Sequence, residues 1–168
     1  MEETKTAEGT PVAAVCCPVF DTTLWDGKTH VWQDKLFMQN DVFQVMHIPV
    51  NMGSVITRMC KKIEEAGAMP DPKDFLMLCY DPSSWKSEIN MTVTKDVPGG
   101  KMVKLTGTFI SRVFDGPYNH VPKWIKEMDQ YLASQGKKAM KYYFHYAYCP
   151  KCSKKYGHNY CAAFAQVA

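Results

Sequence analysis

The sequence has no apolar run that approaches the roughly 18–20 continuous residues of a membrane-spanning helix. Residues 1–5 are mostly charged and precede no apolar segment, so they do not predict a signal peptide. Neither sign of charge dominates, because 20 basic residues against 17 acidic residues give a net charge of +3. That balance does not favour a nucleic-acid surface or an anionic-membrane patch. We therefore expect a cytoplasmic protein whose partners include neither nucleic acid nor a membrane.

Several catalytic motifs are also missing. The sequence contains no glycine-rich phosphate loop, no G-x-S-x-G elbow and no H-E-x-x-H pair, so nucleotide, serine-hydrolase and zincin chemistry have no support. No cofactor is predicted. The seven cysteines cannot all pair within one chain. Without an export signal, free thiols or a metal site are favoured over a disulfide framework.

Aromatic residues and methionine are what the chain does contain in quantity. Aromatic side chains make up 12% of the 168 residues, and there are 11 methionines. Both supply large, adaptable apolar surface. Such surface fills a core, or it lines a concave pocket for a flat organic ligand. Composition does not choose between these two interpretations.

The hydrophobic pattern predicts a mobile tail over 1–12 and a single domain over 13–168, in which 13–40 form an N-terminal elaboration of short strands and loops. The order β-α-β-β is then predicted twice. The first repeat, 41–97, has a strand at 41–48, a helix at 53–66 and strands at 75–80 and 88–94. The second, 102–168, has a strand at 102–114, a helix at 122–134 and strands at 140–148 and 160–167. We expect Cys149-Pro150 to end the strand at 140–148, ahead of the final strand.

An internal duplication would explain this order. A shift of 68 residues superposes Asn51 on Asn119, Tyr80 on Tyr148 and Pro82 on Pro150. The predicted fold class is therefore α+β: duplicated β-α-β-β units, a mostly antiparallel sheet and two helices on one face. A central cleft between the two helices, floored by the sheet, is where we expect a ligand.

The repeat, together with the segment Phe114-Asp115-Gly116-Pro117-Tyr118 that leads into an amphipathic helix, resembles the GyrI-like small-molecule-binding superfamily. The superfamily includes a branch that hydrolyses cyclopropane-bearing natural products. The resemblance implies an aromatic central cleft, often with a buried glutamate. Tyr118 matches the tyrosine after Gly-Pro, and Glu88 matches an acidic residue that opens the last strand of a repeat. The second repeat departs from the pattern, because His158-Asn159 stands where a carboxylate is expected.

The resemblance implies binding of a small, flat, largely apolar organic molecule, with hydrolysis of a strained or activated electrophile as a further possibility. In the hydrolytic case Glu88 would deprotonate water, and Tyr118 would hydrogen-bond the oxygen that gains charge. A solvent-exposed Glu88 at a strand edge is the alternative. Ligand-binding side chains are expected at Trp85, Trp124, Tyr142, Tyr146, Tyr148, His47 and His145. The two histidines could equally be hydrogen-bonded core residues. An enzyme, a passive binder and an interaction module, each as monomer or homodimer, remain open.

The cysteine-rich segment near the C-terminus has two interpretations. Its pattern C-x2-C-x5-H-x2-C could bind zinc in one loop, through the ligands Cys149, Cys152, His158 and Cys161. The spacing between its two halves is short for a zinc finger, so we expect a structural loop with thiols. A redox C-x-x-C pair would need its first cysteine at a helix N-terminus, whereas a connection between strands is predicted here.

Overall fold

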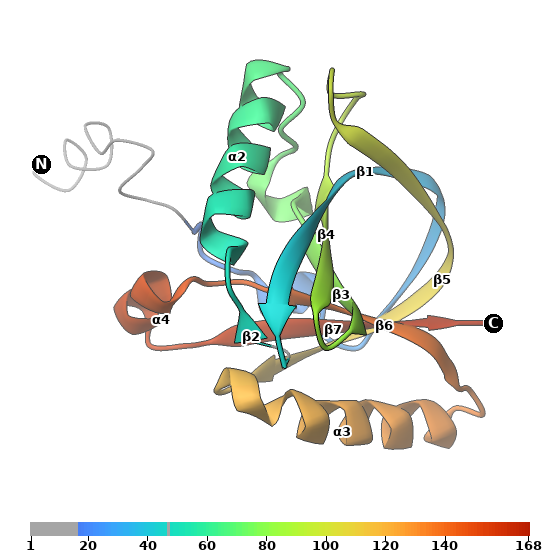
Figure 1. Cartoon of the computed structure of the whole chain (residues 1–168). Coiled ribbons are helices and arrows are strands. Elements are labelled where there is room, and N and C mark those ends of the chain that lie inside the picture. Colours follow the sequence, from blue (N-terminus) through green and yellow to red (C-terminus); the bar gives the residue numbers. More distant parts are fainter. Residues whose placement is uncertain (1–16, 47) are drawn as a thin grey trace, which may run out of the picture.

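The computed structural model describes residues 17–46 and 48–168. Its strands are β1 (Lys28–Val45), β2 (Ile48–Pro49), β3 (Met77–Ser83), β4 (Lys86–Thr92), β5 (Lys101–Asp115), β6 (Ala139–Tyr146) and β7 (Tyr160–Val167) (Figure 1). Its helices are α2 (Met52–Glu65), α3 (Val121–Ser134) and α4 (Pro150–Tyr156), with single 3-10 turns at η2 (Thr22–Leu24), η3 (Pro72–Asp74) and η4 (Tyr118–His120). Among these helices, none combines the length and the apolar character that crossing a membrane requires.

Six strands form a closed, barrel-like ring. The antiparallel order is β1-β4-β3-β6-β7-β5, and β5 pairs back onto β1, while the short β2 extends the other end of β1. The seam between β3 and β6 is the weakest part of the ring, because only two residue pairs join these strands, Leu78 with His145 and Cys79 with Phe144. Long β1 and β5, by contrast, pair along most of their length.

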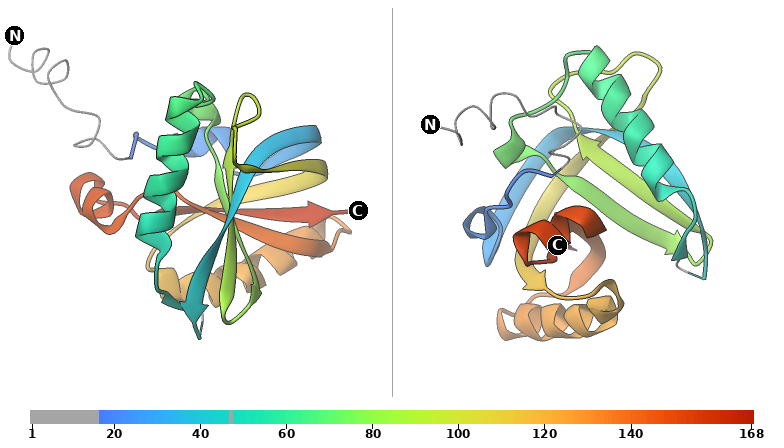
Figure 2. Two further views of the ribbon diagram at one scale, coloured as in Figure 1. Left: turned by 45° about the horizontal axis from the view of Figure 1, so that its top comes forward. Right: turned by 90° about the vertical axis from the view of Figure 1, so that its left-hand side faces the viewer.

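Alternation along the strands divides the apolar side chains into an inner cluster and two outer clusters. The inner cluster fills the ring with Phe37, Leu76, Leu78, Phe109, Tyr143, Ala162 and Phe164. The α2 cluster lies outside, between α2 and the ring, and includes Met38, Val42, Met59, Cys79, Ile89 and Met91. The α3 cluster lies under α3 and includes Ile110, Met128, Leu132, Ala163 and Ala165. Figure 2 shows both helices on the outside of the curved sheet.

The two long helices form where the apolar spacing predicts them. In α2, Val55, Met59 and Ile63 recur every four residues and are buried, while the lysines and glutamates of the helix stay exposed. In α3, Trp124, Met128 and Leu132 repeat the pattern, and a proline occupies its first turn. Proline is tolerated there because the first turn has no intrahelical partner for its missing N–H.

The α+β class and the mostly antiparallel sheet are confirmed. Both halves have the order β-α-β-β, with α4 inserted before β7, and their common origin stays a prediction. The placement of both helices on one face of an open sheet is not confirmed. The strands curl into a ring, and each helix packs on its own outer cluster.

Two local predictions need correction. The segment 13–40, expected to hold short strands, contributes most of β1, which runs unbroken for 18 residues. The segment Cys149-Pro150, which was expected only to end a strand, begins the helix α4. Proline at its first position and Gly157 in the left-handed conformation just past its end are the usual signals of a short helix.

Candidate functional site

A pair of tyrosines lies on the outer side of the ring, between the regions covered by α2 and α3. Tyr118 opens η4, just before α3, and is 46% exposed. Its ring centroid lies 5.3 Å from that of Tyr146 in β6, with the two rings tilted relative to each other. Tyr146 ends a stacked row on β6 that begins with Tyr142 and Phe144. Because Phe144 packs on the α3 cluster and Tyr146 on the α2 cluster, this row links the two outer clusters.

Both phenols of the pair are held in the protonated form. Burial is the main cause that raises the pKa of Tyr118, and the negative charge of Asp81 raises it further. Burial also raises the pKa of Tyr146, with smaller contributions in the same direction from the thiol of Cys161 and from Asp81. Each hydroxyl therefore remains a hydrogen-bond donor through the neutral pH range.

Asp81 is the acidic residue that sequence reasoning missed, because Asp81-Pro82 was interpreted as part of a turn. The strand β3 continues through this position to Ser83. The pairing of β3 with β4 is irregular between Tyr80 and Ser83, so alternation alone does not fix the side of Asp81. Its charge raises the pKa of both Tyr118 and Tyr146, which places the carboxylate on their outer side of the ring.

Glu88 lies on the other side of the sheet from the tyrosine pair. It pairs across the ladder with Tyr80 on β3 and with Asp41 on β1, and directly opposed residues share one face. Tyr80 packs against the inner cluster, so Glu88 also faces inward. Its Oε2 atom lies 3.6 Å from Nζ of Lys86, which also approaches Oδ2 of Asp41 at 3.5 Å. The structure therefore does not bring Glu88 together with Tyr118.

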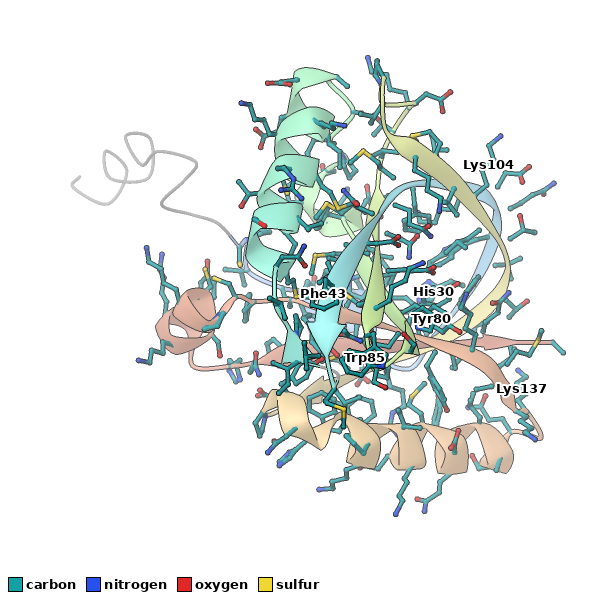
Figure 3. All side chains as sticks on the ribbon, in the orientation of Figure 1. His30, Phe43, Tyr80, Trp85, Lys104 and Lys137 are labelled. Carbon is teal, nitrogen blue, oxygen red and sulfur yellow. The ribbon has the colours of Figure 1, made fainter. Side chains whose placement is uncertain are left out.

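The two predicted tryptophans have different surroundings. Trp85 is 54% exposed in the turn between β3 and β4, close to Phe43 at the end of β1 (Figure 3). The backbone supports this proximity, since the N–H of Gln44 donates to the carbonyl of Trp85. Trp124 is buried in α3 and stacks on Phe114 with ring centroids 5.5 Å apart. Its ring face is already covered by protein.

Three further predicted side chains have partners within the fold. The hydroxyl of Tyr142 donates to the carboxylate of Asp129 in α3. The hydroxyl of Tyr148 accepts the N–H of Phe20 at 2.9 Å. Nδ1 of His145 accepts the N–H of Met77 at 2.9 Å, and burial lowers the pKa of His145 to about 4. These bonds match the core-histidine alternative for His145. His47 lies outside the described residues.

The inside of the ring carries an aromatic strip that sequence reasoning did not identify. Trp32 contacts Phe109 with a centroid separation of 4.4 Å, Phe109 contacts Tyr143 at 6.2 Å, and Tyr143 contacts Tyr80 at 5.8 Å. The ammonium groups of lysines cover both ends: Lys141 lies 3.9 Å from the Tyr80 ring centroid, and Lys35 lies 5.4 Å from that of Trp32. Figure 3 labels Tyr80 within this interior. The strip is part of the core and has a basic border.

Two shallow hollows open beside the C-terminal end of α3. Their volumes are about 390 and 580 Å³, and both are lined by Lys137, Lys138 and Ala139. Tyr142 borders the larger one. Asp129 also lines the larger hollow, but its carboxylate already accepts the hydroxyl of Tyr142. We therefore place the candidate site at the tyrosine pair, where phenols and a carboxylate converge.

The predicted zinc ligands do not assemble. Nδ1 of His158 lies 2.8 Å from Oδ2 of Asp115, and Cys161 is buried within the sheet near Cys79. Cys149 and Cys152 do remain close to each other. A third sulfur, that of Cys17 from the N-terminal part of the chain, lies within 4.8 Å of both.

Comparison with known proteins places the chain in a family. A family model described as bacterial hydrolase matches residues 8–167. The chain belongs to this bacterial hydrolase family. No curated protein is similar enough to match.

Solved structures share the fold at low identity. A hydrolase from Listeria innocua is 11% identical, with a TM-score of 0.61 over 99% of this chain and 98% of that one. SAV2435 bound to tetraphenylphosphonium is 9% identical, with a TM-score of 0.51 over 85% and 94%. EcmrR in its DNA complex is 9% identical, with a TM-score of 0.61 over 99% of this chain but only 62% of EcmrR. The family and these neighbours confirm the resemblance of this bacterial hydrolase family member to the GyrI-like small-molecule-binding superfamily.

Proposed function

We propose that this member of the bacterial hydrolase family binds a small, largely apolar organic cation at the tyrosine pair. The observation that carries the proposal is the ring contact between Tyr118 and Tyr146, whose phenols both lie within electrostatic range of Asp81. Burial is the larger cause of the raised pKa of both phenols, and Asp81 raises the pKa of each further because its negative charge acts on their hydroxyls. Aromatic faces in a negative potential favour a cation over an anion.

The pair itself supplies aromatic surface for such a ligand, because Tyr118 is 46% exposed. Exposed aromatic side chains of this size are more common at binding surfaces than on inert ones. The tetraphenylphosphonium bound by SAV2435 is itself an apolar cation. Asp81 would supply the negative counter-charge for the ligand. The second repeat has no carboxylate at the position where the resemblance implies one.

A matched pair of ions tests the charge preference. Tetraphenylphosphonium and tetraphenylborate have nearly the same shape and opposite charge. We expect tetraphenylphosphonium to bind at least about tenfold more tightly, a difference of about 1.4 kcal/mol. Isothermal titration calorimetry at two salt concentrations measures both affinities and shows how strongly the preference is screened.

Three near-isosteric variants locate the site. Asp81→Asn should remove the preference for the cation, and Tyr118→Phe should weaken binding of both ions because the hydroxyl of a ring in contact with Tyr146 is lost. Glu88→Gln is the matched control, since this carboxylate faces the interior of the ring. A preference for tetraphenylborate would contradict the proposal. So would a cation preference that survives Asp81→Asn and is lost in Glu88→Gln.

We further propose that the same site hydrolyses an activated electrophile, a possibility that the family description supports. Asp81 would accept a proton from water as the oxygen of that water attacks the acyl carbon. The tetrahedral intermediate would then collapse, the bond to the leaving group would break, and Asp81 would return the proton to that group. The protonated phenols of Tyr118 and Tyr146 would donate hydrogen bonds to the oxygen that gains negative charge. The raised pKa of both phenols suits this role, because a donor must keep its proton.

A further inference from the structure

We infer that Cys17, Cys149 and Cys152 form a thiolate site for one Zn²⁺ ion. Their three Sγ atoms all lie within 4.8 Å of one another. In a tetrahedral zinc site with Zn–S bonds of about 2.3 Å, the sulfur atoms are about 3.8 Å apart. Shifts of about half an ångström in each side chain therefore bring the three sulfurs to the separation that zinc coordination requires.

Local structure positions two of the ligands. Cys149 is the N-cap residue of α4, and Cys152 lies in the first turn of the helix, where it is buried. The amide of Ser153 donates to the carbonyl of Cys149 at 2.9 Å, which closes this turn. Two cysteines separated by two residues are the commonest zinc-binding pair, because the spacing lets both sulfurs face one point.

The third ligand comes from the opposite end of the chain, which explains why spacing along the sequence did not reveal it. The Sγ atom of Cys17 accepts the N–H of Cys149 at 3.4 Å, and the carbonyl of Cys17 accepts the hydroxyl of Tyr156 at 2.9 Å. An amide that points at a sulfur favours its thiolate form, as in the outer shell of metal–cysteine sites. These two contacts hold Cys17 against α4.

The charge of the surroundings suits a three-thiolate site. Binding releases the three thiol protons to solvent, and three thiolates with one Zn²⁺ carry a net charge of −1. Lys151, Lys154 and Lys155 in α4 provide compensating positive charge. The described residues supply three ligands, and a fourth, from the protein or from solvent, would complete a tetrahedral site.

The site would connect the N-terminal segment to the ring. Phe20 and Trp25, which follow Cys17, pack against the inner cluster from one end. A metal bound by Cys17 and α4 would hold this segment in place in addition to the hydrogen bond from Phe20 to Tyr148. This inference does not depend on the proposed ligand site.

Metal titration of the full chain tests the site directly. The reduced protein is incubated with Zn²⁺, dialysed and analysed for bound metal, and Co²⁺ is used as a spectroscopic probe. We expect one ion per chain and a thiolate-to-cobalt charge-transfer band with the intense visible bands of tetrahedral Co²⁺. Cys17→Ser, Cys149→Ser and Cys152→Ser should each lower zinc affinity at least about tenfold. Cys60→Ser in α2, away from the cluster, is the matched control.

Differential alkylation of the unmutated chain keeps the inference testable where a variant fails to fold. Zinc should protect Cys17, Cys149 and Cys152 from iodoacetamide and leave the rate at Cys60 unchanged. Metal retention in Cys152→Ser at the original affinity would overturn the inference. Two other results would also overturn it: equal alkylation with and without zinc, or a reductant-sensitive mass deficit of two hydrogens that shows a disulfide within the cluster.

Discussion

At the scale of single residues, the position of a carboxylate on one face of a strand or the other decides its chemistry. Asp81 and Glu88 belong to neighbouring strands, β3 and β4, but face opposite sides of the sheet. Asp81 lies beside two phenols that keep their protons. Glu88 lies beside the ammonium of Lys86 and opposite Tyr80 in the strand ladder. The donors near Asp81 are neutral phenols, whereas Glu88 is paired with a cation.

Asp81→Asn should therefore abolish most hydrolysis of an activated aryl ester. A general base contributes about 10²–10⁴-fold to a rate, so turnover should fall by that factor. The rate of product formation measures turnover. Its inhibition by tetraphenylphosphonium shows whether hydrolysis occurs at the binding site. Circular dichroism confirms that each variant is folded.

Glu88→Gln is the control for this measurement, and we expect it to keep turnover within a few-fold of the original. The opposite pattern, a large loss in Glu88→Gln and none in Asp81→Asn, would move the catalytic base to the inside of the ring. Absence of turnover in every form would contradict hydrolysis and leave the binding proposal to be judged by its own experiment.

At the scale of elements, a bulge in β1 organises the interior of the ring. Trp32 pairs with Gly107 and Lys35 with Leu105, so β1 has one extra residue relative to β5 between these points. Asp34 absorbs the irregularity with φ of +53°, and its N–H donates to Oγ1 of Thr106 at 2.9 Å. The bulge turns Trp32 and Lys35 to the same face, although simple alternation would separate them.

Substitutions of Asp34 should show how much the bulge contributes to stability. Asn tolerates the left-handed conformation, so Asp34→Asn should change the free energy of unfolding by less than about 0.5 kcal/mol. A β-branched residue does not, and Asp34→Val should cost about 1–2 kcal/mol. Urea unfolding monitored by tryptophan fluorescence measures both. Equal stability of the two variants would show that the bulge relaxes without cost.

At the scale of the whole molecule, the ring depends on its narrow seam between β3 and β6. Only two residue pairs join these strands, and His145 belongs to one of them. Its Nδ1 atom also accepts the N–H of Met77, a bond that requires the unprotonated nitrogen. Protonation of one buried imidazole would therefore weaken the contact that closes the sheet.

Acid should destabilise the protein through this residue. The pKa of His145 is lowered from 6.5 to about 4 in the folded state, so the unfolded state binds the proton at higher pH. Its contribution is fully present above pH 6.5 and is lost as the pH falls toward 4, by about 3 kcal/mol. Urea unfolding at a series of pH values measures this slope.

His145→Gln isolates the effect, because its side-chain oxygen can still accept the N–H of Met77 but does not titrate. We expect the variant to be less dependent on pH between 6.5 and 4 than the unmutated protein. His120→Gln, at an exposed histidine, is the control. A slope that is unchanged in His145→Gln would assign the acid sensitivity to other groups.

The sequence by itself determined the elements whose periodicity is strong. Spacing of apolar residues predicted α2 and α3 to within about one residue at each end, and β7 to the residue. Alternation along the strand predicted at 140–148 places Tyr142, Phe144 and Tyr146 on one side, and their stacking agrees with this. These features depend on neighbours along the chain, so local pattern contains them. Even α4 had its signals in Pro150 and Gly157, which the prediction of a plain turn overlooked.

Only the tertiary structure decided which residues from distant parts of the chain lie next to one another. The closing of the ring decides which side of each strand is the interior. That closure separates Glu88 from Tyr118 and brings Asp81 to it. It also brings Cys17 to Cys149 across more than 130 residues of chain. The physical reason is that strand pairing and packing join segments distant in sequence, and their register is set by the burial of the whole core rather than by local pattern.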